Sequence, residues 1–138
     1  MNVHGCIFCR IIAGNAPAFI LCEDEHSLAF MDINPVAPGH ALIISKTHAE
    51  TIFDLPVPDL KAVSATVKKV AQAVNSALLP DGISIVQSNG RGAAQSVLHF
   101  HMHVVPRSMD DGLLLNWPLR PGELSAIEAT AERIRAYL

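Results

Sequence analysis

One stretch decides the fold, and it reads QSVLHFHMHVVPR at residues 95–107. His99, His101 and His103 alternate there with Phe100 and Met102. Strict alternation of this kind is typical of a half-buried β-strand, because successive side chains point to opposite faces of a sheet. We therefore predict a strand whose three histidines project from one face, about 6.5–7 Å apart along the strand, with the apolar residues packed behind them.

The histidine cluster has two explanations. A single histidine on an apolar strand is most often a buried residue with a hydrogen-bond partner. Three histidines in register are harder to explain in this way, because each buried imidazole needs a partner of its own. The cluster therefore favours a functional site over simple packing.

Length and composition limit the class of protein. A chain of 138 residues, half of them hydrophobic, is expected to form a single globular domain over residues 1–138. It has no apolar run of about 18 residues and no basic leader, so we expect neither a membrane span nor a signal peptide. The net charge of −3 argues against binding a polynucleotide. An odd count of three cysteines fits a reducing compartment, and we predict the cytoplasm.

The remaining periodicities predict the other elements of the fold. We expect a short helix over residues 6–13, a β-hairpin over 19–22 and 27–31, and strands over 41–45 and 83–87. A long helix is expected to start within residues 54–58, and a final amphipathic helix within 122–138. The long helix has one apolar stripe, formed by Val63, Val67, Val70, Val74 and Leu78. Together these predict an α+β fold, an antiparallel sheet of about five strands backed by the helices.

Two further motifs carry candidate chemistry. Residues 88–96 are rich in small residues, which let backbone N–H groups approach a phosphate closely, although most such loops only connect strands. The pair Cys6 and Cys9 is compatible with a redox motif, half of a metal site, or two buried small residues. No βαβ pattern accompanies the pair, so the redox reading, a disulfide oxidoreductase, is the weakest.

The sequence around the histidines resembles the histidine triad (HIT) signature, His-φ-His-φ-His-φ-φ with φ apolar. The resemblance includes CIFCRII at residues 6–12, FMDINPVAPGH at 30–40 and KTH at 46–48, and it extends to about residue 107. It implies a HIT-like homodimer whose two sheets join into one continuous sheet. It also implies a nucleotide site and hydrolysis or transfer at the α-phosphorus of a nucleotide.

The resemblance also assigns roles at the reacting phosphate. His101 would be the nucleophile, forming a nucleotidyl-histidine that water resolves, while the carbonyl of His99 holds its second nitrogen. A neutral imidazole is a good nucleophile near pH 7, which makes this chemistry reasonable in itself. His103 would donate to phosphate oxygens or to the leaving group. Ser96, by its hydroxyl and backbone N–H, and Gln95, by its amide, would complete a phosphate cradle.

A purine nucleotide of AMP or GMP type is the implied ligand. Asp32 matches the residue that accepts from the ribose hydroxyls, although an Asx turn explains it too. His40 is expected to support the triad structurally. Two positions depart from the family pattern: Ala94 replaces a common glycine, and Ser88 replaces Asn or Gln, so that Asn89 either takes over that contact or does not. The walls around the base would be Ile7, Phe8, Ile11, Phe30 and Ile33, although single apolar residues of this kind are more often plain core.

A structural zinc ion is the implied cofactor. Relatives that open with this Cys-x-x-Cys use it with two histidines, which here are His48 and His99, and a Cys₂His₂ set is ordinary for zinc. The alternatives are a reduced, metal-free pair of Cys6 and Cys9 or an incidental disulfide.

The sequence and the resemblance leave three functions open. The first is a hydrolase of nucleoside phosphoramidates or dinucleoside polyphosphates. The second is a nucleotidyltransferase, which the presence of His103 disfavours because that branch has glutamine there. The third is a nucleotide-binding adaptor without required turnover. The apolar residues 113–118 are expected either near the partner's active site in the dimer or in the core.

Overall fold

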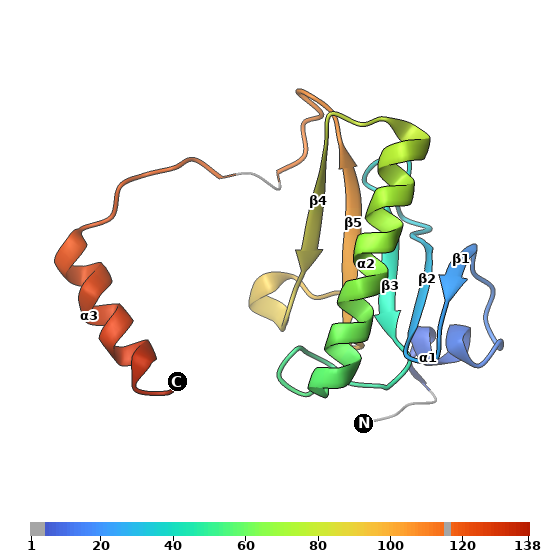
Figure 1. Cartoon of the computed structure of the whole chain (residues 1–138), viewed down its shortest axis with the longest axis horizontal. Helices are drawn as coiled ribbons and strands as arrows, with labels where there is room; N and C mark the ends of the chain where they lie inside the picture. The colour runs from blue at the N-terminus through green and yellow to red at the C-terminus, as the bar shows by residue number, and fades with distance from the viewer. Residues whose placement is uncertain (1–4, 115–116) are drawn as a thin grey trace.

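The structure is a computed structural model that describes residues 5–114 and 117–138. The fold contains a five-stranded sheet. Figure 1 shows a long helix lying across this sheet and the C-terminal helix apart from it. The elements in chain order are α1 (Ile7–Ile12), β1 (Ile20–Glu23), β2 (Ser27–Met31), β3 (Ala41–Ser45), α2 (Val57–Leu78), β4 (Gly82–Gln87), the 3₁₀ turn η2 (Arg91–Ala93), β5 (His101–Arg107) and α3 (Leu124–Arg135).

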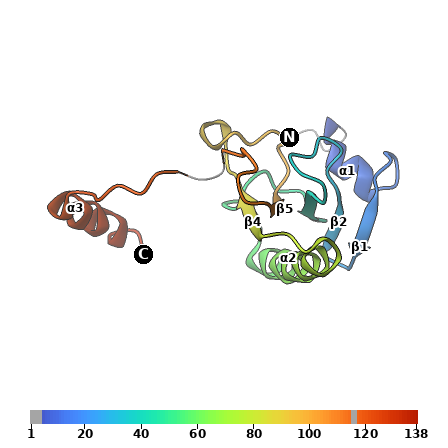
Figure 2. The same cartoon turned by 90° about the horizontal axis from the view of Figure 1, so that it is seen from above.

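The sheet is antiparallel throughout, with strand order β1-β2-β3-β5-β4. Helix α2 covers one face of it, as the view from above shows (Figure 2). The predicted α+β class, with an antiparallel sheet backed by helices, is confirmed. The predicted strand bounds agree with the observed ones within about two residues at each end.

Alternation along the strands divides the core into two clusters. On one face, Ala29, Ile43 and Val104 pack against α2. On the other face, Leu28, Phe30, Leu42 and Ile44 pack against Phe8 and Ile11 of α1. Since Phe100 and Val104 point toward α2, the even spacing places His101 and His103 on the α1 face. The histidines therefore share a face with the first helix.

The apolar stripe of α2 is buried along most of its length. Val63, Val67, Val70 and Val74 face the sheet, as predicted. Leu78 departs from the prediction because its side chain is 49 % exposed at the last turn. It lies over Gly39, whose φ is +94° and where any Cβ would collide with it. The stripe therefore ends one turn earlier than its sequence pattern.

The histidine strand is shorter than predicted. Its pairing with β3 begins at His101, which lies opposite Ile44, so His99 stands outside the strand. The backbone explains this, since the N–H of Phe100 donates to the carbonyl of Ala49 (2.7 Å) instead of to a neighbouring strand. The rings of His101 and His103 also lean together, with centroids 4.9 Å apart and planes at 65°, closer than the predicted spacing along the strand.

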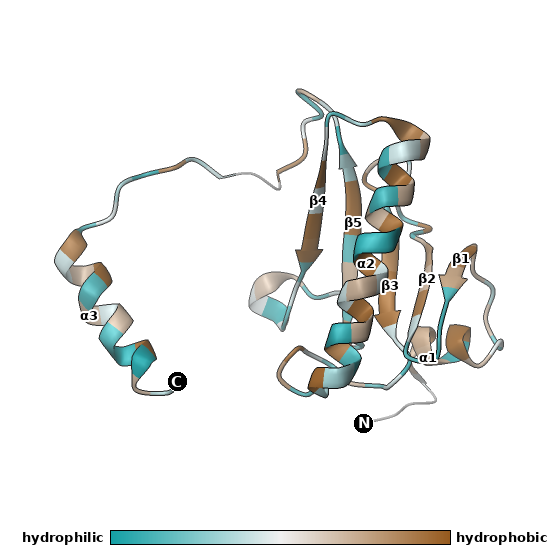
Figure 3. Ribbon diagram, in the orientation of Figure 1, coloured by the Kyte–Doolittle hydropathy of each residue, from teal (hydrophilic) through white to brown (hydrophobic). Residues whose placement is uncertain are grey.

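Helix α3 forms at the predicted place but buries none of its residues. Its apolar residues Leu124, Ile127 and Ile134 are 79 %, 53 % and 57 % exposed. Figure 3 shows brown, apolar patches along α3, which lies away from the sheet. The apolar segment 113–118 was expected near the partner's active site or in the core. Residues 115 and 116 lie outside the described part of the chain. Leu114 and Trp117 are exposed, so these two side chains do not pack in the core of the protomer.

Among the described residues, no helix has the length and apolarity that a membrane crossing needs.

Candidate active site and metal centre

His101 is held in the form that a nucleophile requires. Its Nδ1 lies 2.7 Å from the carbonyl oxygen of His99, and a carbonyl only accepts, so Nδ1–H donates and Nε2 keeps its lone pair. The ring is buried, and Phe8 packs edge-on against it at 5.2 Å. This burial lowers the pKa of His101, outweighing the His99 hydrogen bond and the charge of Asp32, which both raise it. The imidazole is therefore neutral near pH 7.

A cavity of about 710 Å³ opens beside this ring. Its volume falls within the range of small-molecule sites, and its lining is mostly apolar, as in sites that enclose a base. Ile33 is 75 % exposed and stands at its rim. The structure brings together nine of the predicted nucleotide-site residues around it: Ile7, Phe8, Ile11, Phe30, Asp32, Ile33, Ser96, His101 and His103.

Asp32 forms the expected Asx turn and also lines the cavity. Its Oδ1 accepts from the backbone N–H of Asn34 (2.8 Å), which is an Asx turn. Its Oδ2 lies 3.5 Å from Nε2 of His40, and the side chain lines the cavity. The Asx turn therefore holds the Asp32 carboxylate at the wall of the cavity.

Three predicted residues are not brought to the cavity: Ser88, Asn89 and Gln95. The prediction that the amide of Gln95 contacts phosphate is not supported, because both ends of this amide bind backbone groups of the protein. Its Oε1 accepts from Gly90 N–H (2.8 Å), and its Nε2 donates to the carbonyls of Glu50 (2.6 Å) and Val97 (3.0 Å). Asn89 Oδ1 likewise accepts from the backbone N–H of Ile52 (2.8 Å). These amides shape the loop.

Ala94 stands in a backbone conformation that favours glycine. Its φ of +59° and ψ of 36° lie in the left-handed region. A Cβ in this region costs about 1 kcal/mol. The departure from the family's glycine therefore leaves local strain in the loop, while the turn itself is kept.

Four side chains meet on the other side of His99. Nδ1 of His99 lies 3.4 Å from Sγ of Cys6 and 3.1 Å from Nδ1 of His48, which is itself 3.1 Å from Sγ of Cys9. The four atoms all lie within 4.8 Å of one another. Nε2 of His99 donates to the carbonyl of Ser45 (2.7 Å), so its Nδ1 carries a lone pair toward the cluster.

This cluster fits zinc. Tetrahedral zinc with bonds of about 2.0–2.3 Å separates its ligand atoms by roughly 3.3–3.8 Å, close to the distances seen here. Burial lowers the pKa of His99 to about 4, so it is neutral as a ligand must be. Burial, followed by the neighbouring Cys6, raises the pKa of the Cys9 thiol to about 11. A cation at the centre would reverse that effect and hold both sulfurs as thiolates.

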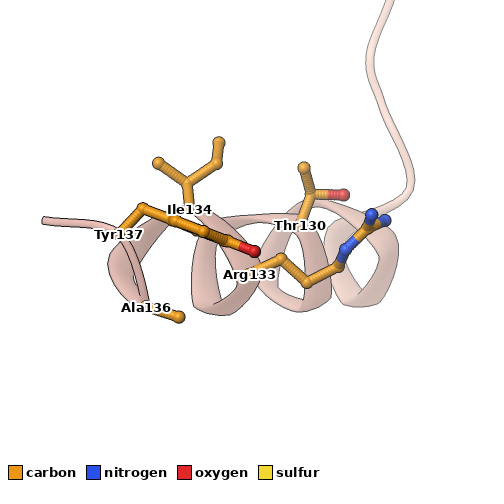
Figure 4. A pocket seen from close by; sticks show the side chains of 5 residues that line it. All are labelled: Thr130, Arg133, Ile134, Ala136 and Tyr137. Atoms are coloured by element: carbon orange, nitrogen blue, oxygen red, sulfur yellow. The ribbon is translucent and has the colours of Figure 1, made fainter.

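Two groups of the site were not predicted: the Ser45 carbonyl, which accepts from His99, and the Val36 N–H, which lies 3.2 Å from Nδ1 of His40. Both are backbone groups, so no side-chain pattern could have marked them. Another depression is lined by three side chains of α3 and by Ala136 and Tyr137, which follow that helix (Figure 4). It contains no histidine, cysteine or carboxylate, and we assign it no chemistry.

The fold and the site thus define a protein that presents a neutral histidine to a nucleotide-sized cavity on an antiparallel sheet. Comparison with known proteins gives the family. Residues 13–110 match the model of the HIT domain. The chain is 43 % identical over 115 residues to Protein hit of Bacillus subtilis (strain 168), covering 83 % of this chain and 79 % of that protein. It is 39 % identical over 134 residues to the adenosine 5'-monophosphoramidase hnt1 of Schizosaccharomyces pombe, covering 96 % and 98 %. The chain belongs to the HIT family.

Solved structures agree with this assignment. A HIT family protein from Bacillus anthracis matches with a TM-score of 0.89 and 34 % identity, over 97 % of both chains. A zinc-bound histidine triad family protein from Mycobacterium smegmatis matches with a TM-score of 0.76 and 33 % identity, over 99 % of this chain and 100 % of that one. The first match covers nearly the whole chain and therefore includes α3.

Proposed function

We propose that the protein is a HIT-type nucleotide hydrolase that cleaves nucleoside 5'-phosphoramidates by way of a covalent nucleotide on His101. The observation that carries this proposal is the tautomer of His101. Its Nδ1–H is bound by the His99 carbonyl at 2.7 Å, so the bare Nε2 is left for phosphorus in a cavity of nucleotide size. The fission yeast relative named an adenosine 5'-monophosphoramidase supports the substrate class.

Two displacements at phosphorus follow from this arrangement. In the first, the lone pair of His101 Nε2 forms a bond to the α-phosphorus, and the bond to the leaving nitrogen breaks with its electron pair, which takes a proton from His103 so that the amine leaves neutral. In the second, water attacks the same phosphorus and gives a proton back to His103, and His101 departs with its electron pair restored. Ser96, which lines the same cavity as His103, supplies a hydrogen-bond donor for the phosphate oxygens.

Asp32 and the apolar walls position the nucleotide. The Oδ2 of Asp32 accepts from the ribose hydroxyls, while Phe8, Phe30 and Ile11 pack against a purine of AMP or GMP type. Dinucleoside polyphosphates offer the same α-phosphorus, and they are the alternative substrates within this proposal.

Zinc is proposed at Cys6, Cys9, His48 and His99, in agreement with the zinc-bound relative from Mycobacterium smegmatis. With four protein ligands, its role is to hold α1 and His99 together. His99 in turn orients His101 through its carbonyl, so the metal acts on the position of the nucleophile.

We also propose a cytoplasmic homodimer. Strand β4 is an edge of the sheet, and an edge strand presents backbone groups that a second copy can pair with. The exposed apolar stripe of α3 gives a second surface for the partner. Sedimentation should show a species of about 30 kDa, twice the 14.8 kDa chain, whereas a single species of 14.8 kDa at micromolar concentration would contradict the dimer. The three cysteines are unpaired, which fits a reducing compartment.

A single-turnover experiment tests the hydrolase. Adenosine and guanosine phosphoramidates are mixed with excess enzyme, quenched in the millisecond range and analysed by mass spectrometry. The proposal expects one nucleotidyl group on the peptide that contains His101. The matched control is His26→Ala, an exposed histidine bonded to Asp59, which should turn over like the wild type, while His101→Ala should form no adduct. Full turnover by His101→Ala would refute the assignment, and a panel that includes diadenosine tri- and tetraphosphate ranks substrates by kcat/KM.

A further inference from the structure

The inference concerns the two cysteines of the metal cluster, Cys6 and Cys9. Both lie in one helical turn, because Cys6 is the N-cap of α1 and its Sγ accepts from the backbone N–H of Cys9 (3.4 Å). Their sulfur atoms lie within 4.8 Å of each other. Two thiols three residues apart at the start of a helix form a Cys-x-x-Cys pair, an arrangement that also serves as a redox dithiol.

The four side chains of the cluster differ in exposure. His99 is fully buried, whereas His48 and both cysteines are half-buried. The sulfur atoms therefore lie on the side of the cluster that solvent reaches, and the nitrogen of His99 lies on the protected side. A zinc ion at the centre keeps both sulfurs as thiolates, and the thiolate is the form of cysteine that peroxides oxidise. A small oxidant thus reaches reactive sulfur without entering the core.

The cluster joins α1 to the sheet. The cysteines belong to α1, while His48 follows β3 and His99 precedes β5. A helix of six residues has little stability of its own, so its position depends on the groups that attach it to the rest of the protein. Its other anchors include Phe8 and Ile11, which pack in the core on this face of the sheet. Loss of the cluster therefore removes one of the attachments that hold α1.

Helix α1 also forms part of the nucleotide cavity. Ile7, Phe8 and Ile11 line this cavity. The ring of Phe8 packs edge-on against the rings of His99 and His101, with centroids 5.8 and 5.2 Å apart. A change in the cluster that frees α1 therefore reaches both the wall of the cavity and the ring of the nucleophile.

We propose that Cys6 and Cys9 form a redox switch, in which a peroxide converts the two thiolates into a disulfide, releases zinc from the cluster and frees α1. The inference rests on the proposed function and its zinc centre, and it adds regulation of that site.

The chemistry of the switch takes two steps. One thiolate attacks an oxygen of hydrogen peroxide and breaks the O–O bond, which gives a sulfenic acid and hydroxide. The other thiolate attacks the sulfenic sulfur, which forms the S–S bond and releases a second hydroxide. The two sulfurs lose two electrons in total, and the peroxide becomes two molecules of water when the hydroxides take up two protons. A disulfide offers no thiolate to the metal, so the centre no longer holds it.

The test exposes the full-length, zinc-loaded protein to hydrogen peroxide. Zinc release is followed by the absorbance of a chromophoric chelator, and the tryptic peptide of residues 1–10, which contains both cysteines, is analysed by mass spectrometry. One zinc ion should be released for each disulfide that forms, faster than without peroxide, and a dithiol reductant with added zinc should restore the starting protein. The matched control Cys22→Ser, which removes the cysteine outside the cluster, should behave like the wild type. Zinc that stays bound with Cys6 and Cys9 reduced, or a disulfide that involves Cys22, would overturn the proposal.

Two further measurements show whether oxidation reaches the nucleotide site. Amide hydrogen exchange of α1 should become faster in the oxidised protein. AMP should bind about tenfold more weakly in calorimetry, the loss expected when a side chain as large as Phe8 no longer packs on the base. Unchanged exchange and unchanged AMP affinity after zinc release would overturn the proposal, because the disulfide would then have no effect on the site.

Failure of the switch and failure of the proposed function give different results. His101→Ala, which cannot turn over, should release zinc on oxidation like the wild type. A switch that operates in a protein without activity on any nucleotide would support the inference and refute the hydrolase alone. Zinc retained by an active hydrolase would overturn the switch alone, and a protein that binds no zinc would overturn the metal centre and the switch together.

Discussion

Acid should destabilise the metal-free protein through His99, and the size of the effect follows from the structure. His99 has no exposed surface, and burial lowers its pKa from 6.5 to about 4. In the unfolded chain it binds a proton near pH 6.5, so unfolding takes up a proton between pH 6.5 and 4 and stability falls as the pH is lowered through that window. The whole difference in pKa corresponds to about 3 kcal/mol of folding free energy, of which roughly 2 kcal/mol is lost between pH 7 and pH 5.

The assay compares two proteins by urea unfolding in the presence of a chelator, at pH 7 and at pH 5. His99→Gln is the matched variant, because its amide keeps a donor for the Ser45 carbonyl and does not titrate. The wild type should lose about 2 kcal/mol more than the variant, a difference of about 1 M in the urea midpoint for a slope near 2 kcal/mol per molar. His103, whose pKa is also lowered to about 4 by burial, titrates in both proteins and cancels. Equal losses in the two proteins would refute the reasoning.

Three further changes test other parts of the site. Asp32→Asn should weaken AMP binding by about 1.5–3 kcal/mol but leave inorganic phosphate unaffected in calorimetry, since the amide oxygen still accepts from Asn34 N–H; equal losses for both ligands would show that Asp32 acts through the turn. Elemental analysis of the wild type should find about one zinc per chain, Cys9→Ser should lose it with a lower Tm, and Cys22→Ser should keep it; a wild type that carries no metal and withstands chelator unchanged would argue against zinc at this cluster. Ala94→Gly should raise the free energy of unfolding by about 0.5–1 kcal/mol because φ is +59°, while Ala93→Gly, in the preceding turn, should lower it; a loss at both positions would contradict the strain.

Much of the fold could be predicted from the sequence because it rests on local patterns. The strands of the sheet alternate or form short apolar runs, and the valines of α2 repeat at helical spacing, so both signals lie within a few residues of one another. The early end of the α2 stripe could not be predicted, because the burial of Leu78 depends on how much of it is covered by other segments, such as the distant loop that contains Gly39.

The candidate site was predicted in part. The residue types of the cavity and the metal centre came with the family resemblance, and the structure brings most of them together. The structure differs from the prediction where hydrogen bonds with backbone groups determine the position of a residue. The side-chain amide of Gln95 is hydrogen-bonded to the backbone of Glu50 and Gly90. His99 lies outside the strand because the next residue, Phe100, donates its backbone N–H to the carbonyl of Ala49. Hydrogen bonds between segments so far apart in the sequence cannot be predicted from the local spacing of residues. The tautomers of the histidines are set in the same way, by carbonyls and N–H groups.

In the proposed reaction, His101 attacks phosphorus and water then displaces His101 from it, so hydrolysis takes two displacements. Each in-line displacement inverts the configuration at phosphorus, so two of them restore it. The direct measurement is the stereochemical course of hydrolysis of an adenosine phosphoramidothioate of defined configuration, in water enriched in heavy oxygen, read by ³¹P NMR. We expect net retention of configuration at phosphorus. The His99 carbonyl binds Nδ1–H of His101, so the lone pair of Nε2 is available to form the covalent intermediate. Net inversion would contradict it, since a single attack by water would then suffice.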